Sequence, residues 1–185
     1  MKRFIHICSL HVIILGICLV SCQKLRPEKI NVSEYPDLSS IYVDQYKLLH
    51  NETVQKEVWL NGDYESKVIP MDSARWKEEL LFLKEIDPSK PELVGVFEKT
   101  ENKKGILLLV KNGEKSSLRR LGISYEGGLT TSINAIVHEQ KEVFTYYREI
   151  QVKFSEGIIN QWQIKGYQSM MLSDTVNFEL SARVK

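Results

Sequence analysis

A period of two among the apolar residues in the second half of the chain constrains the fold more than any other feature. At the C-terminal end, Val176, Phe178 and Leu180 alternate with polar residues, which places them on one face of a β-strand. Comparable stretches run over 93–99, 106–111, 118–125, 129–138, 143–154, 158–166 and 175–184. The unbroken apolar run 106–110 predicts a strand covered on both faces. We therefore expect about seven strands against a hydrophobic layer.

Two amphipathic helices and a hairpin are expected before these strands. Residues 37–50 and 73–86 carry apolar residues at helical spacing. Between them, Asn61-Gly62 separates 53–60 from 63–69, and this dipeptide tolerates the positive φ values of a two-residue turn. The order predicts an α+β fold. It consists of a curved antiparallel β-sheet of about seven strands plus an N-terminal hairpin, with two helices packed on one face.

The first 21 residues have the pattern of an export signal. Lys2 and Arg3 form a basic start, and the apolar run 12–20 is too short to span a bilayer. The residues Leu19-Val20-Ser21-Cys22 resemble the lipobox of bacterial lipoproteins. This resemblance implies that Cys22 is acylated and becomes the first residue of the mature chain. An ordinary signal peptide followed by a free cysteine is the alternative.

The resemblance divides the chain into three parts. Residues 1–21 are the signal peptide, 22–36 the acylated cysteine and a polar tether, and 37–185 a single α+β domain. Surface-exposed lipoproteins of Bacteroidota often carry acidic residues directly after the acylated cysteine, whereas residues 23–26 here read Gln-Lys-Leu-Arg. We therefore expect an outer-membrane lipid anchor with the domain on the periplasmic side.

Residues 76–91 carry a second resemblance. The segment begins Trp-Lys-Glu-Glu-Leu and ends Asp-Pro-Ser-Lys-Pro. A Trp-x-x-Glu-Leu helix ending near Asp-x-x-Lys-Pro resembles uncharacterised small lipoproteins of Bacteroidota, in which it follows a helix and a hairpin. The resemblance implies a cell-envelope location and this order of elements, and it implies no activity.

Charge and cysteine content exclude several classes of function. Without residues 1–21 the chain has 164 residues, with 23 Lys and Arg against 24 Asp and Glu, so nothing indicates nucleic acid as a partner. All three cysteines, Cys8, Cys18 and Cys22, lie in the signal or at its end. The domain therefore has no disulfide and no thiolate ligand, and we expect no metal and no cofactor.

No arrangement of residues indicates catalysis. His50 and His138 are the only histidines after the signal, and neither has the spacing of a zinc site. Glu78 and Glu79 are adjacent and point about 100° apart on a helix, which favours a solvated surface over an acid–base pair. Gly127-Gly128 fits a hairpin turn better than a phosphate-binding loop. We therefore expect no enzymatic activity.

Arg148 is the charged residue of the strands that most needs an explanation. It falls in phase with Tyr146 and Ile150, on the face expected to be apolar. An inward guanidinium needs an anion. That anion is either a protein carboxylate or the headgroup of a ligand.

Aromatic residues gather near this position. Tyr146, Tyr147, Trp162 and Tyr167 become neighbours if the strands that contain them pair as a hairpin. The group serves either as core and cross-strand packing or as a ligand-binding surface.

These observations favour a non-enzymatic lipoprotein that is anchored through Cys22 and binds a partner in the cell envelope. The alternative is a carrier of an apolar or lipid-like ligand, held in a cavity between helices and sheet and reached past Trp76 or Trp162. The candidate ligand-binding residues are Arg148, Tyr146, Trp162 and Trp76.

Overall fold

The computed structural model describes residues 34–49 and 51–185. The expected signal peptide, Cys22, the tether up to residue 33 and His50 lie outside the described residues. Residues Asn31–Lys185 form one compact unit with its own hydrophobic core. A segment that folds independently needs such a core. Within the described ranges, no helix is long and apolar enough to span a membrane.

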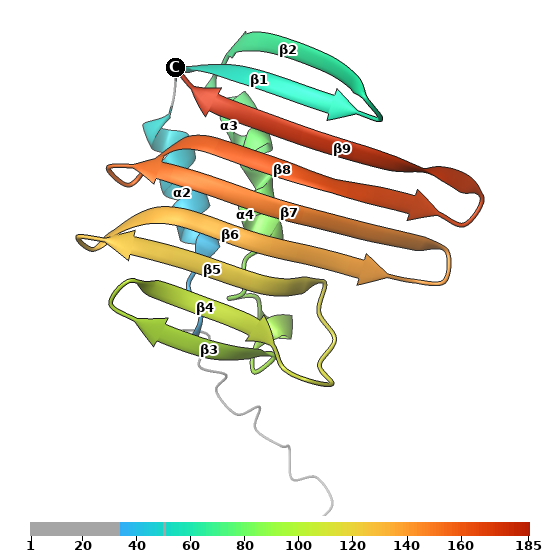
Figure 1. Ribbon diagram of the computed structural model, residues 1–185. Coiled ribbons are helices and arrows are strands. Elements are labelled where there is room, and N and C mark those ends of the chain that lie inside the picture. Colours follow the sequence, from blue (N-terminus) through green and yellow to red (C-terminus); the bar gives the residue numbers. More distant parts are fainter. Residues whose placement is uncertain (1–33, 50) are drawn as a thin grey trace, which may run out of the picture. The chain divides into compact units, whose positions relative to one another are not determined.

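One open antiparallel sheet of nine strands organises this unit (Figure 1). Its spatial order is β2-β1-β9-β8-β7-β6-β5-β4-β3. The strands are β1 (Thr53–Leu60), β2 (Asp63–Pro70), β3 (Phe97–Asn102), β4 (Gly105–Val110), β5 (Leu118–Glu126), β6 (Leu129–Gln140), β7 (Phe144–Ser155), β8 (Ile158–Met170) and β9 (Ser173–Val184). From β3 to β9 each strand pairs with the next in the chain, because short turns favour antiparallel neighbours.

The N-terminal hairpin extends this same sheet, so the sheet exceeds the expected seven strands. β1 pairs with β9 from Val54 opposite Val184 to Leu60 opposite Phe178. Asn61 and Gly62 form the expected turn, with φ values of 52° and 100°. An isolated two-stranded hairpin is only marginally stable in water, so pairing of β1 with β9 stabilises it.

All helices of the described chain lie on one face of the sheet (Figure 1): α2 (Leu38–Leu48), α3 (Ser73–Glu79), α4 (Leu81–Glu85) and the 3₁₀ turn η2 (Pro91–Leu93). The single helix expected over 73–86 is divided at Leu80, which has φ −91° and ψ 6°. Both halves still bury one continuous face, so its apolar spacing predicted burial correctly. The strand expected from residue 93 begins only at Phe97, because Pro91 initiates η2.

Asp87 fixes the start of α2 against the end of α4. The residue is 1 % exposed. It accepts hydrogen bonds from the backbone N–H groups of Ser39 and Ser89, each at 3.0 Å, and from both serine hydroxyls. The first N–H groups of a helix have no partner within the helix, and Asp87 supplies one from another element. Exposed Asp37 accepts from Ser40 N–H at the same helix end.

The core lies between the helices and the sheet. Trp76 of α3 and Trp162 of β8 are 0 % and 1 % exposed, and their ring centroids are 5.9 Å apart. Gln45 of α2 spans the layer's edge, where its side chain donates to Gly157 O and accepts from Ile159 N–H. The helices therefore bury one face of the sheet and leave the other uncovered.

Candidate functional site

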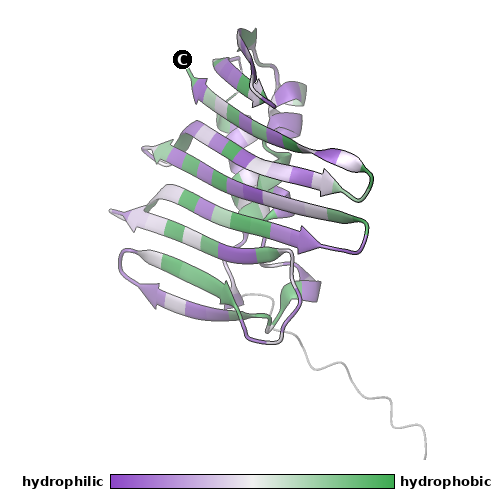
Figure 2. Cartoon of the chain, turned by 45° about the vertical axis from the view of Figure 1, so that its right-hand side comes forward, coloured by the Kyte–Doolittle hydropathy of each residue, from purple (hydrophilic) through white to green (hydrophobic). Residues whose placement is uncertain are grey.

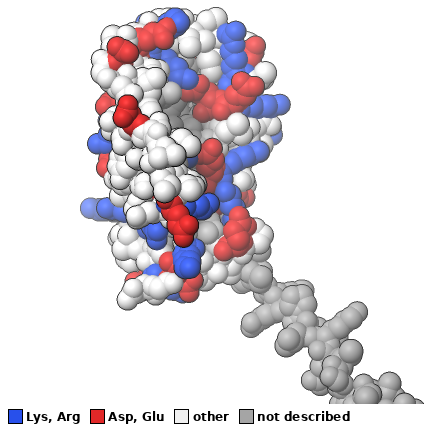
Figure 3. All heavy atoms as spheres, turned by 90° about the vertical axis from the view of Figure 1, so that its right-hand side faces the viewer, with Lys and Arg blue, Asp and Glu red and all other residues white. Residues whose placement is uncertain are grey.

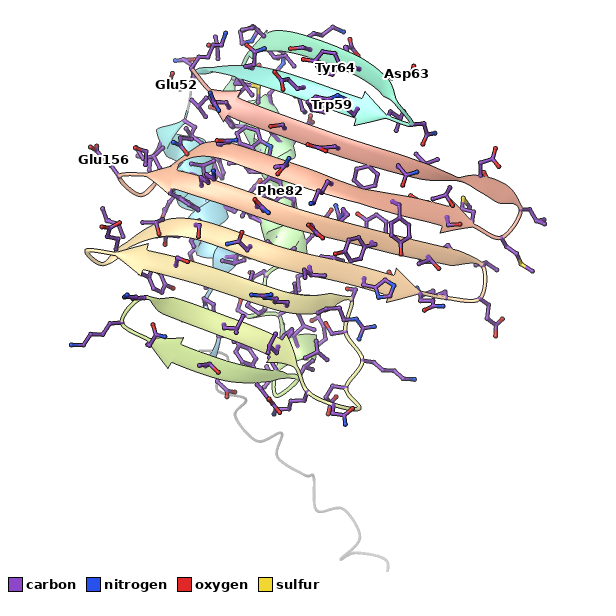
Figure 4. The ribbon with its side chains drawn as sticks, viewed as in Figure 1. Glu52, Trp59, Asp63, Tyr64, Phe82 and Glu156 are labelled. Atoms are coloured by element: carbon purple, nitrogen blue, oxygen red, sulfur yellow. The ribbon has the colours of Figure 1, made fainter. Side chains whose placement is uncertain are left out.

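The face of the sheet opposite the helices is the candidate functional surface, and we call it the outer face. The strand register alternates side chains between the two faces, and Figure 4 views the sheet from the uncovered side. The residues of the outer face used below are Trp59, Tyr64, His138, Tyr147, Glu149, Gln163, Lys165, Tyr167, Asn177 and Glu179.

A stack of rings lies on β6, β7 and β8. Tyr147 and Tyr167 are directly paired across the strands, and their rings are 5.6 Å apart and nearly parallel, at 17°. The His138 ring meets the other side of Tyr147 edge-on at 6.1 Å. All three side chains are half-buried. Offset stacking fixes these rings in place, so they present a rigid aromatic surface.

Glu149 connects this stack to the charged residues of the outer face. It accepts a 2.6 Å hydrogen bond from the Tyr147 hydroxyl and lies 3.0 Å from Lys165 Nζ. The hydrogen bond from Tyr147, followed by that from Lys165, lowers the pKa of Glu149. The same bond is the largest cause that raises the pKa of the Tyr147 phenol. The carboxylate and the phenol therefore stay in their charged and neutral forms across the physiological range.

A second aromatic pair lies on the N-terminal hairpin. Trp59 and Tyr64 are paired across β1 and β2, and their ring centroids are 4.8 Å apart (Figure 4). A shallow hollow of about 420 Å³ beside Trp59 is also lined by Asn61, Asn177 and Glu179. The outer face thus combines two aromatic groups with amide and carboxylate side chains.

A row of charged residues joins the two aromatic groups. Register places Trp59 opposite Glu179, Glu179 opposite Lys165, and Lys165 opposite Glu149. Gln163 donates to Glu179 at 2.7 Å. These side chains hold one another in defined positions, so the polar part of the face is preorganised.

Arg148 points toward the helices, as its phase with the apolar residues predicts. Its guanidinium lies 2.6 Å from a Glu85 carboxylate oxygen of α4 and 4.6 Å from the centre of the Tyr146 ring. Within the described part of the chain, Arg148 Nε is buried without a hydrogen-bond partner. Of the two anions that the sequence allowed, the structure supplies the protein carboxylate.

The other two candidate ligand-binding residues, Trp76 and Trp162, lie inside the core. Each indole N–H is buried and lacks a hydrogen-bond partner among the described residues. The two rings pack against each other, so they join helix α3 to the sheet.

The sheet divides the aromatic neighbourhood expected from the sequence. Tyr147 and Tyr167 stack on the outer face, whereas Tyr146 and Trp162 lie on the helix side. Sequence reasoning missed the contribution of Trp59, because the pairing of β1 with β9 joins distant segments. The alternation of Trp59 with Val58 and Leu60 was the available signal.

The outer face carries aromatic rings beside ion-paired and hydrogen-bonded side chains. His138 contacts a tyrosine ring, and in the part of the chain that the structure describes no three His, Cys, Asp or Glu residues gather as metal ligands. Tyr and Trp side chains are enriched where proteins meet partners, since each combines a large apolar area with a polar group.

Comparisons of the chain with protein-family models, with curated proteins and with solved structures find no match.

Proposed function

We propose that this protein is a non-enzymatic lipoprotein, anchored in the outer membrane through Cys22 and facing the periplasm, that binds an envelope protein with the outer face of its sheet. The observation that carries the proposal is the rigid stack of Tyr147 on Tyr167, adjoining the Glu149–Lys165 ion pair on a face without helices. The lipobox resemblance of residues 19–22 supports the anchor.

The composition of the outer face supports a protein partner. Tyr and Trp are enriched in protein interfaces and among the residues that contribute most to binding. Here the aromatic groups at Trp59 and Tyr147 are separated by ion-paired and hydrogen-bonded side chains. A partner that docks on preorganised groups loses little conformational entropy, which favours affinity.

Site-specific photocrosslinking in the native membrane tests the binding face. A photoreactive phenylalanine analogue replaces Tyr167 or Trp59 in the anchored chain, and the matched control replaces Leu81, which is 45 % exposed on the helix layer. We expect the same discrete adduct from positions 167 and 59, lost on Glu149→Lys, and none from position 81. Adducts from position 81 alone would contradict the proposal.

Membrane fractionation tests the anchor separately. Cys22→Ser removes the thiol that carries the lipid, and two or more acyl chains make membrane binding stable. We expect the variant to leave the outer-membrane fraction. Retention of the Cys22→Ser variant in that fraction would overturn the lipid anchor and leave the outer face untouched as a binding surface.

A carrier of an apolar ligand is the second candidate, and one observation favours it. On the helix side of the sheet, Leu60 and Val176 are 49 % and 36 % exposed, and Phe178 between them is half-buried. Figure 3 views this end of the molecule and shows a depression in its surface beside acidic side chains. Native mass spectrometry of residues 23–185 tests it: a reproducible added mass, lost on denaturation, would support the carrier.

A further inference from the structure

Two hairpin turns at one end of the sheet expose apolar side chains together. The turn between β6 and β7 exposes Val143, and the turn between β8 and β9 exposes Met170, Met171 and Leu172, the last at 98 %. Met171 N–H donates to Val143 O at 3.0 Å, which ties the two turns together. Figure 2 colours the β8–β9 turn and the start of β7 as hydrophobic, beside the hydrophilic end of β6. We call Val143, Phe144, Met170, Met171 and Leu172 the apolar tip.

The backbone does not require these residue types. Turns usually carry Gly, Asn, Asp or Ser, since these residues accept unusual φ values or bond to the local backbone. The turns at Asn61-Gly62 and Glu156-Gly157 each contain a glycine, and both residues of each turn have positive φ. Met171 and Leu172 have no positive φ, so polar residues fit the same turn. Their apolar side chains need a reason outside the fold.

We propose that the apolar tip inserts into the surface of a lipid bilayer. Exposed apolar patches mark sites that contact a protein or a membrane. A standard protein interface uses about 20–30 residues a side, and the tip offers five, four of them exposed and Phe144 half-buried, where β7 begins and β8 ends. Shallow insertion at the boundary of headgroups and acyl chains needs only a small projecting apolar group.

The charges around the tip define the kind of insertion. Lys141 lies 2.7 Å from Glu139 and 5.1 Å from the centre of the Phe144 ring, and Glu142 is adjacent. This rim carries no excess of positive charge. Insertion therefore depends on burial of apolar area, and neither anionic lipid nor low salt strengthens it.

The proposed anchor brings the domain close to a membrane. Residues 23–33 separate Cys22 from Glu34, and at about 3.3–3.6 Å per residue they span at most about 40 Å. An anchor at Cys22 therefore keeps Glu34, the first described residue, within about 40 Å of a bilayer. Only this step rests on the proposed anchor.

Vesicle co-sedimentation of residues 31–185 tests the insertion without the anchor. The probes are vesicles of phosphatidylcholine alone and vesicles with added phosphatidylglycerol, at low and at high salt. The tip variant is Met171→Asp with Leu172→Asp, and the control is Leu129→Asp, an exposed leucine at the β5–β6 turn. Circular dichroism verifies that each variant keeps the wild-type fold, which we expect because all three side chains are exposed.

We expect wild type and Leu129→Asp to bind both vesicles equally at either salt concentration, and the tip variant to bind at least about tenfold more weakly, a change of about 1.4 kcal/mol. Absence of wild-type binding would overturn the insertion, as would equal loss in the Leu129→Asp control. Strengthening by phosphatidylglycerol would overturn the apolar mechanism. None of these results bears on the Cys22 anchor, which the fractionation of Cys22→Ser tests by itself.

Discussion

Replacing Asp87 by alanine tests whether this buried carboxylate stabilises the helix layer. The variant leaves the N–H groups of Ser39 and Ser89 without their 3.0 Å acceptor. A buried donor that loses its partner costs at least about 1 kcal/mol. Loss of the negative charge at the start of α2 costs about 0.5 kcal/mol more. We expect the free energy of unfolding to fall by about 3 kcal/mol.

Thermal denaturation of residues 31–185, followed by circular dichroism, measures this loss. For a domain of this size, a decrease of about 3 kcal/mol lowers the melting temperature by about 6–12 °C. Asp37→Ala is the matched control, because Asp37 caps the same helix from an exposed position, and loss of such a cap costs about 1 kcal/mol. Equal decreases for the Asp87→Ala and Asp37→Ala variants would refute the reasoning.

Three further predictions concern the sheet. In Tyr147→Phe, the pKa of Glu149 rises toward its ordinary value, as an NMR titration of the carboxyl would show. Because the pKa of Glu149 is lower in the folded than in the unfolded chain, its bond with Tyr147 stabilises the fold at pH values above the ordinary glutamate pKa. This stabilisation is lost as the pH falls through the folded-state pKa. In Gly166→Ala the added Cβ overlaps the carbonyl oxygen of Tyr147. We expect this to lower the free energy of unfolding by about 1–3 kcal/mol, seen as a lower midpoint of urea denaturation. A double-mutant cycle of Arg148→Met and Glu85→Gln should give a coupling of about 1 kcal/mol, because Glu85 is 54 % exposed.

Local sequence patterns predicted most of the elements of this fold. The period of two located seven strands, and Asn61-Gly62 located the hairpin turn, because both signals depend on near neighbours. Predictions that depended on distant partners were weaker. The run 106–110 indicated a strand covered on both faces, yet Leu109 is 42 % exposed, since no helix lies on the outer face. The helix expected over 73–86 is divided at Leu80, but its apolar residues keep their helical spacing, so the sequence pattern could not predict the division.

The candidate site was predictable only in part for a related reason. The phase of Arg148 correctly indicated an inward cation, but no local pattern names Glu85, which lies on α4. The expected pairing of the two strands was correct, but it grouped Tyr146 with Tyr147, although neighbouring strand residues point to opposite faces. The stack of Tyr147 on Tyr167 required the exact register between β7 and β8.

The pairing of β1 with β9 has a consequence for the order in which the protein folds. Antiparallel neighbours from β3 to β9 form between near segments, which closes small loops and is fast. The edge of β1 at Val54 must wait for Val184, which lies at the other end of the chain. During synthesis, which proceeds from the N-terminus, the β1–β2 hairpin emerges first and stays unpaired on that edge until β9 is made. An unpaired edge of this kind invites aggregation, so β9 both completes the sheet and ends the period of greatest risk.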